Sequence, residues 1–336
     1  MSRSQLTSTV EQNTGGPVAP FVAGKNKIIN GDFGVWQRGT SFSLNGGTIY
    51  TSDRWYVNYD GTGATRTASQ QTFAAGTAPV AGYEGTYFYR LATTVAGSGQ
   101  TYSNFTQPIE DVRIFAGQTV TLSFWAKADS NRTISPGWGQ QFGSGGSSAV
   151  YGSFSTASLT TSWQRFSSTV SINSIAGKTI GASSKFEINL GWPGNSTFTI
   201  DFWGVQLEAG SVATPFTTAT NTVQGELAAC QRYYNRFNIT AYYPSGIFGN
   251  AISTTNARIG IALGTQMRIA PATLDYANIY LSDGATSTTL TALDSTLSST
   301  SVGLLNGTVA SGLTQFRGYN MAASSSAGYI GFSAEL

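Results

Sequence analysis

The chain has 336 residues, only 10% of them are charged, and its net charge at pH 7 is +2. This length allows two domains that each bury a core, and the charged fraction lies well below the roughly 25% of an ordinary globular protein. No run of Lys or Arg could neutralise a phosphate backbone or an anionic bilayer, which excludes nucleic acid and membrane as partners.

The first 27 residues predict an extended arm. They are polar, contain Gly15, Gly16, Pro17 and Pro20, and show neither a strand period nor a helix period. We expect this arm (residues 1–27) to order against a partner protein; the alternative is a frayed terminus. The arm lacks the apolar core of a secretory signal, and the chain has no stretch of about 18 apolar residues. We therefore expect the protein to be made in the cytoplasm and to stay there until assembly or lysis.

Residues 28–219 predict a long series of strands. Val120, Leu122 and Phe124 alternate with hydroxyl-bearing residues, so that one face of the strand is apolar and the other polar. Comparable alternation recurs, and the loops between such segments are rich in Gly, Ser and Asn. Short strands without intervening helices favour two antiparallel sheets packed face to face.

Residues 220–238 predict one amphipathic helix that links the sandwich to the C-terminal residues. Leu227, Cys230, Tyr234 and Phe237 are spaced by three, four and three positions, which places them on one helical stripe. Asn221 or Thr222 would cap the helix. We expect the stripe to pack against the sandwich, against the next domain, or against the same helix of another copy. Residues 239–336 return to strand signals and predict a smaller β domain, whose thin core would gain from packing against symmetry mates.

Several short motifs resemble a family of bacteriophage and prophage tail proteins. They lie in the same order as in that family and span almost the whole chain after the arm. The motifs are residues 27–39 (KIINGDFGVWQRG), 52–56 (SDRWY), 201–216 (DFWGVQLEAGSVATPF), 230–234 (CQRYY), 267–271 (MRIAP) and 334–336 (AEL).

This resemblance implies an all-β fold. It consists of a jelly-roll β-sandwich like those of carbohydrate-binding modules, one short helix and a smaller C-terminal β domain, assembled as a homotrimer in a tail fibre. The expected location is the virion, where the arm would attach to other tail or capsid proteins. In related jelly rolls, acidic residues at the positions of Asp32 and Asp201 hold a structural Ca²⁺. Here Gly34 replaces a ligating Glu, which removes both charge and a ligand, so the alternative is that both Asp residues cap turns and no cofactor is bound.

Glycan binding requires an aromatic face and nearby amides or hydroxyls on exposed loops. Two segments, residues 136–141 and 191–196, each carry a Trp between turn residues. We therefore predict that a host surface glycan contacts Trp138, Gln140, Trp192 and Asn195, with Tyr242 and Tyr243 as a second candidate surface. The alternative is that the two Trp residues lie in a subunit interface.

Catalysis is not expected. The chain has no His, so the commonest general base is missing, and Cys230 fits a buried apolar position. A polysaccharide depolymerase remains an alternative, because two carboxylates facing each other across a groove, one of them protonated near neutral pH, would indicate hydrolysis. The other alternative is a capsid decoration or tail-adaptor protein that binds no glycan.

Overall fold

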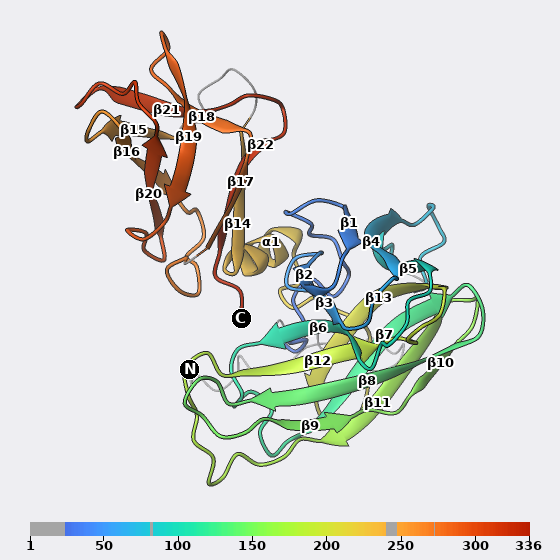
Figure 1. Ribbon diagram of the computed structural model, residues 1–336. Coiled ribbons are helices and arrows are strands. Elements are labelled where there is room, and N and C mark those ends of the chain that lie inside the picture. The colour runs from blue at the N-terminus through green and yellow to red at the C-terminus, as the bar shows by residue number, and fades with distance from the viewer. Residues whose placement is uncertain (1–23, 81–82, 240–246, 272) are drawn as a thin grey trace, which may run out of the picture.

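The computed structural model describes residues 24–80, 83–239, 247–271 and 273–336 (Figure 1). Within these ranges the chain forms strands and a single short helix. Most of the predicted arm lies outside the described residues, as do Tyr242 and Tyr243. No helix in the described ranges is long and apolar enough to span a membrane.

Two antiparallel sheets form a sandwich from residues 41–209. The first sheet has six strands. In spatial order they are β1 (Ser41–Leu44), β4 (Thr65–Thr72), β5 (Tyr87–Val95), β13 (Phe198–Ala209), β7 (Thr119–Ala128) and β11 (Gln164–Ser171). The second sheet has seven strands. They are β10 (Ala157–Leu159), β8 (Arg132–Gln141), β12 (Lys185–Gly191), β6 (Ser103–Ile109), β3 (Tyr56–Tyr59) and β2 (Gly47–Tyr50), with β9 (Val150–Ser153) also paired to β8.

The chain crosses repeatedly between the two sheets, as a jelly roll does. Strands β5, β6, β7 and β8 belong alternately to the first and second sheet, and so do β11, β12 and β13. Apolar side chains on the inner faces fill the space between the sheets. Near its centre, Phe105 stacks on Tyr89 and Trp55, with ring centroids 4.2 and 4.6 Å away. The predicted all-β jelly roll is therefore confirmed.

The helix is shorter than predicted. Helix α1 spans Val223–Gln231, and Thr222 caps it by accepting a hydrogen bond from the Gly225 N–H (3.0 Å). The predicted stripe is therefore wrong in its second half, because Tyr234 and Phe237 lie in strand β14 (Tyr234–Ile239). Backbone pairing of β14 with strand β22 outweighs the local helical spacing there.

The two helical members of the predicted stripe differ in burial. Cys230 is buried, as predicted, and burial raises the pKa of its thiol well above the usual range. Leu227 is 38% exposed in the single chain, so it does not pack as a core residue. A contact between Leu227 and another copy stays a prediction.

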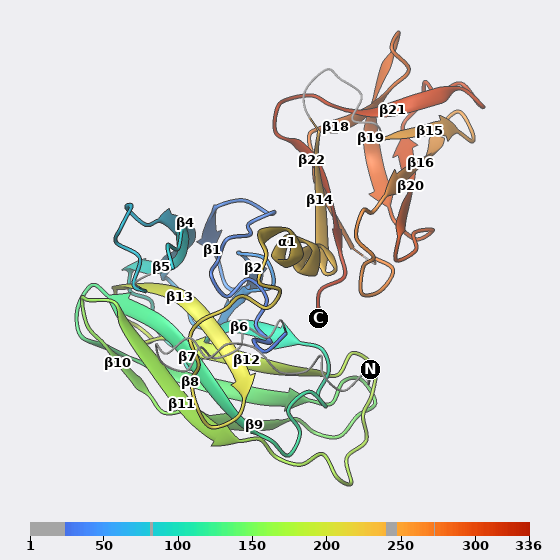
Figure 2. The same cartoon turned by 180° about the vertical axis from the view of Figure 1, so that it is seen from behind.

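The C-terminal region combines a small sheet with a closed barrel (Figures 1 and 2). The three-stranded sheet has the order β14, β22 (Gly328–Ser333) and β17 (Thr273–Ala277). The barrel has the order β15 (Phe248–Ala251), β16 (Asn256–Ala262), β20 (Val302–Val309), β19 (Ser287–Asp294), β18 (Ile279–Ser282) and β21 (Gly318–Ala323). Both share one apolar core, so the predicted smaller C-terminal β region is confirmed.

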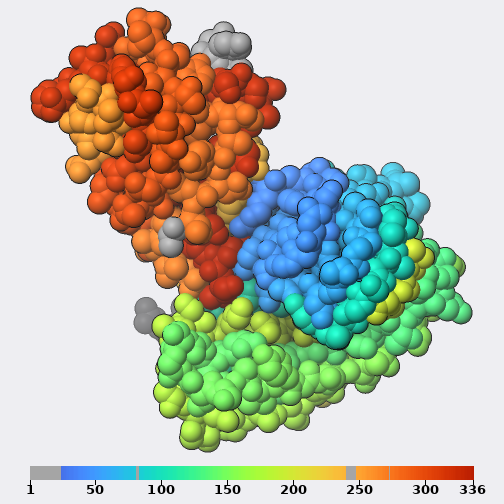
Figure 3. Space-filling model, viewed as in Figure 1, coloured from blue at the N-terminus to red at the C-terminus, as the bar shows by residue number. Residues whose placement is uncertain are grey.

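A buried ion pair joins the C-terminal segment to the sandwich. The Arg54 guanidinium, 1% exposed, bonds to the Glu335 carboxylate and donates to the Pro108 carbonyl (2.6 Å). It also lies 3.4 Å from the centroid of the Tyr233 ring. Arg38 makes a second ion pair with Glu335 (3.3 Å). In Figure 3 the red C-terminal segment accordingly packs against the blue N-terminal part of the sandwich.

Candidate functional site

Both Trp residues predicted to bind glycan are inside the protein. Trp138 is 5% exposed in the middle of β8, where its ring stacks on Phe186 (centroids 6.1 Å apart, planes at 13°). Trp192 is 5% exposed just after β12 and meets Tyr59 edge to face. The loop prediction for Trp138 was wrong because the surrounding Gly and Pro residues lie within a strand. Both rings contribute to the sandwich core.

The two polar residues predicted to bind glycan, Gln140 and Asn195, instead bond to groups of the protein itself. Gln140 is fully buried and donates to the Asn173 carbonyl (2.9 Å). Asn195 is exposed, but its amide bonds to both the N–H and the carbonyl of Gln100 (3.0 and 3.2 Å), which holds two loops together. The structure therefore does not assemble the predicted site from these residues.

The alternate positions of the same strands form a polar surface instead. Because successive side chains of a strand point to opposite faces, the neighbours of Trp138 and Ile188 point outward. On the outer face of the seven-stranded sheet, residues paired across adjacent strands form a continuous row. It runs Ser153 (β9), Gly137 (β8), Asn189 (β12), Thr106 (β6), Tyr56 (β3) and Tyr50 (β2).

A second, parallel row lies beside it and ends in the most exposed aromatic side chain of this face. It contains Tyr151 (β9), Gly139 (β8), Glu187 (β12) and Pro108 (β6). Tyr151 is 65% exposed. With adjacent strands about 4.8 Å apart, the five steps from β9 to β2 give a face about 24 Å long. We call this outer face, made of the two rows, the sheet face.

Two buried glycines lie in the middle of the sheet face, under side chains of the neighbouring strands. A Cβ on Gly139 would lie 3.1 Å from the Tyr151 ring and 3.2 Å from the Glu187 side chain. A Cβ on Gly137 would lie 3.1 Å from the amide of Asn189. The absence of side chains at these two positions makes room for the side chains of Asn189 and Glu187, which are half-buried, and for the exposed Tyr151 ring.

The polar groups of the sheet face are held in place by one another. Gln141 donates to the Glu187 carboxylate (2.9 Å) and to the Tyr151 hydroxyl (3.0 Å), and Lys185 lies 3.6 Å from the same carboxylate. At the other end, Tyr50 and Tyr56 pack edge to face with centroids 5.4 Å apart. Burial, reinforced by the Glu187 charge, raises the pKa of Tyr56, so its phenol stays protonated and can donate. The arrangement offers aromatic faces, amides, hydroxyls and one carboxylate.

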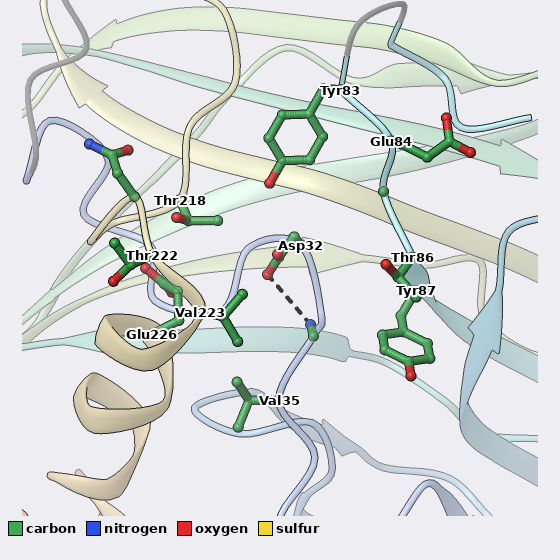
Figure 4. A pocket seen from close by; sticks show the side chains of 13 residues that line it. Asp32, Val35, Tyr83, Glu84, Thr86, Tyr87, Thr218, Thr222, Val223 and Glu226 are labelled. Atoms are coloured by element: carbon green, nitrogen blue, oxygen red, sulfur yellow. Dashed lines mark hydrogen bonds between the residues drawn. The ribbon is translucent and has the colours of Figure 1, made fainter. Parts of the chain in front are cut away.

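A separate cavity of about 650 Å³ opens beside the N-terminus of α1 (Figure 4). Asp32 projects into it, and Tyr83 projects toward Asp32 from the opposite wall. Asp32 and Glu226 both line the cavity. This is the arrangement of two carboxylates that would point to hydrolysis.

Glu226 has a structural role that accounts for its carboxylate. One oxygen accepts the Asn30 N–H (2.8 Å), and the other accepts the N–H and the hydroxyl of Thr220 (2.7 and 2.9 Å). The side chain thereby ties the first turn of the sandwich to the segment that enters α1. A carboxylate with three such bonds is poorly placed to attack a sugar or to activate water.

Asp32 is much less satisfied. Its single hydrogen bond among the described residues comes from the Gly34 N–H at 3.4 Å. Burial, together with the charge of Glu226, raises its pKa from 3.8 to about 6. The carboxyl group is therefore held in a place that disfavours its charge and offers few protein donors.

This pKa predicts how stability changes with pH. An acid with a higher pKa in the folded state stabilises the fold when protonated, and this contribution is lost as pH rises from about 4 through about 6. We expect Asp32→Asn to be more thermally stable than the wild type at pH 7.5, with the difference shrinking toward pH 4. Thermal midpoints across this range measure it, and Asp129→Asn on the surface is the control. Parallel curves for wild type and Asp32→Asn would contradict the prediction.

Asp201 is paired with cations of the chain itself. Its carboxylate accepts two hydrogen bonds from Arg90 (2.7 and 2.9 Å) and lies 3.6 Å from the Lys127 ammonium. No group of three or more metal-binding side chains occurs among the described residues. The residues around Asp201 therefore fit an ion pair better than a Ca²⁺ site, since cations already neutralise the carboxylate.

The solved structures that resemble this chain have low similarity. One described as "CBM4 structure and function" is 18% identical and covers 54% of this chain and 98% of its own, with a TM-score of 0.32. The enzymatically active domain of tailspike protein 4 from Bacteriophage CBA120 is 16% identical and covers 55% of this chain but 22% of its own, with a TM-score of 0.34. The CBM22-2 xylan-binding domain of Paenibacillus barcinonensis Xyn10C is 16% identical and covers 47% and 92%, with a TM-score of 0.32.

A comparison with curated proteins gives no match. A family profile does match part of the chain, from just before β4 to just after β12, and the matched part includes strands β6, β8, β9 and β12 of the sheet face. Residues 61–193 are similar to the family described as "Carbohydrate binding domain".

Proposed function

We propose that the protein binds a polysaccharide along the sheet face. The observation that carries the proposal is the pair of rows in which the exposed Tyr151 ring lies beside the polar side chains of Glu187 and Asn189 over two glycines of β8. Tyrosine rings can stack on the apolar side of a sugar, while amides and carboxylates bond to its hydroxyls. Thr106 and Pro108 of β6 are buried, so the part of the sheet face that a glycan can reach lies at β9 and β12.

The double variant Tyr151→Ala/Glu187→Ala tests this proposal. It removes one stacking face and the central acceptor, and we expect polysaccharide affinity to fall at least tenfold, which corresponds to about 1.4 kcal/mol. Affinity electrophoresis against a panel of host-derived polysaccharides measures it. Tyr276→Ala, which removes a tyrosine with 38% exposure from the C-terminal region, is the matched control. Equal retardation of the double variant and the wild type would contradict the assignment.

We further propose that the protein is a homotrimeric tail-fibre component of a phage virion that adheres to host surface polysaccharide. The order of the tail-protein motifs along the chain supports this role, and so does the match to a carbohydrate-binding family. Three copies per fibre would turn weak single contacts into strong attachment. A stable monomer at micromolar concentration in a size measurement would count against the trimer, and unlabelled host cells would favour a decoration protein.

We also propose that binding is not accompanied by cleavage. The saturated hydrogen bonding of Glu226 supports this, because it leaves Asp32 without an evident partner carboxylate in the cavity. Release of reducing ends from host polysaccharide, abolished by Asp32→Asn, would instead favour a depolymerase.

A further inference from the structure

The Asp32 cavity is separate from the sheet face and is built from three segments. Asp32 and Val35 come from the turn before β1, Tyr83 and Tyr87 come from the approach to β5, and Thr218 comes from the segment that leads into α1. Its volume of about 650 Å³ lies within the 300–1,000 Å³ of typical small-ligand sites. Figure 4 shows these side chains surrounding one space.

The cavity carries hydrogen-bonding groups that the described part of the protein does not use. No hydrogen bond joins the hydroxyls of Tyr83, Tyr87, Thr86 or Thr218 to another described residue, and Asp32 has only its long contact with Gly34. Polar groups in a partly enclosed space tend to be bonded. A ligand with several hydroxyls would supply donors to Asp32 and meet the phenols and hydroxyls opposite.

The charge of the cavity limits the kind of ligand. Asp32, Glu84 and Glu226 line it, and no Lys or Arg of the described residues does. Glu84 is exposed and accepts the Gly76 N–H (2.6 Å) with one oxygen, and Glu226 accepts three hydrogen bonds, so Asp32 is the less exposed carboxylate with few protein donors. The negative field disfavours any group that carries a carboxylate or phosphate.

We propose that the Asp32 cavity is a second glycan-binding site, which takes a single sugar residue without an acidic group. Vicinal hydroxyls of the sugar donate to the Asp32 carboxylate, and its apolar side lies against a tyrosine ring and Val35. A partly open cavity of this volume suits a single sugar residue, whereas the sheet face is an outer surface. The inference rests on the proposed function in that the ligand is a glycan, but it uses different residues.

The test uses the full chain and simple sugars. Saturation-transfer NMR with methyl glucoside, methyl galactoside, methyl mannoside, glucosamine and glucuronate detects binding in the millimolar range. We expect at least one uncharged or amino sugar to bind and glucuronate to bind at least tenfold more weakly. Asp32→Asn should lower the affinity for the sugar at least tenfold. Tyr83→Phe, which removes only a hydroxyl, should lower this affinity severalfold.

Three outcomes would overturn the proposal. The first is the absence of saturation transfer from every sugar at about 10 mM, near the weak end of measurable affinities. The second is binding that neither Asp32→Asn nor Tyr83→Phe changes, and the third is binding that favours glucuronate. Tyr83→Phe keeps the test valid if Asp32→Asn fails to fold. The sheet-face variant Tyr151→Ala/Glu187→Ala should leave monosaccharide binding unchanged. If monosaccharide binding fails while polysaccharide binding at the sheet face is kept, this inference is wrong and the proposed function stands. If polysaccharide binding at the sheet face fails while monosaccharide binding is kept, the proposed function is wrong and this inference stands.

Discussion

Glu335→Ala is expected to destabilise the protein by about 3–5 kcal/mol, the largest effect of a single charge removal that we foresee. Without Glu335, the guanidinium of Arg54 remains buried at 1% exposure, beside the Pro108 carbonyl and the Tyr233 ring but without a carboxylate bonded to it among the described residues. Removing one partner of a buried ion pair leaves an uncompensated charge, which is more costly than the pair itself is stabilising. Denaturant unfolding monitored by Trp fluorescence measures the change.

The double variant Arg54→Met/Glu335→Gln separates charge burial from packing. It removes both charges of this pair while keeping similar volume, so we expect part of the lost stability to return, whereas Arg38 still loses its ion pair with Glu335. Arg113→Ala is the control, because its pair with Asp111 is exposed on both sides and should contribute less than about 0.5 kcal/mol. If the double variant is as unstable as Glu335→Ala, the contact depends on shape and not on charge.

Trp138→Ala is expected to cost about 3–5 kcal/mol of folding free energy. The ring is buried in the sandwich, stacks on Phe186 and leaves no room for a side chain at Gly152, whose Cβ would collide with it. Deleting it would open a large void between the two sheets. The thermal midpoint should therefore fall by many degrees. A loss of glycan binding in this variant would then not by itself show that the ring contacts the ligand.

Tyr151→Ala, which removes an exposed ring from the neighbouring strand β9, is the comparison for Trp138→Ala. Its side chain is 65% exposed, so we expect a stability change below about 1 kcal/mol but a measurable loss of polysaccharide affinity. If Trp138→Ala keeps its stability and loses binding, then Trp138 is a ligand-contacting residue and its buried position is not the one used in solution.

Alternation along the chain was enough to predict the sandwich. In β7, Val120, Leu122 and Phe124 are buried in the core, as their period of two indicated. Local chemistry in the same way limited the N-cap to Asn221 or Thr222, and the structure places it at Thr222. The end of the helix did not, because Tyr234 is drawn into β14 by backbone bonds to Ser333, which lies about 100 residues away in the sequence. A local period cannot report a distant pairing partner.

The candidate site was predicted least well. Trp138 and Trp192 were predicted to bind glycan because they stand between turn residues, whereas Gly137, Gly139 and Glu187 belong to no distinguishing motif. One signal was present: Phe186, Ile188 and Leu190 alternate with Glu187 and Asn189, which indicates that the polar pair faces outward. Sequence alone could not show that these two residues lie beside the two glycines of β8.

The sequence by itself determined the all-β class and the burial of Cys230, because each depends on local period or composition, and the resemblance of its motifs to tail proteins implied the jelly roll. The tertiary structure decided which face of each strand is exposed, where the helix ends, and that Asp32 faces a cavity while Asp201 meets Arg90 and Lys127. Those features depend on the register between strands that are distant in the chain. Register is set by the packing of the whole core, and a shift of one residue would exchange the buried and exposed faces.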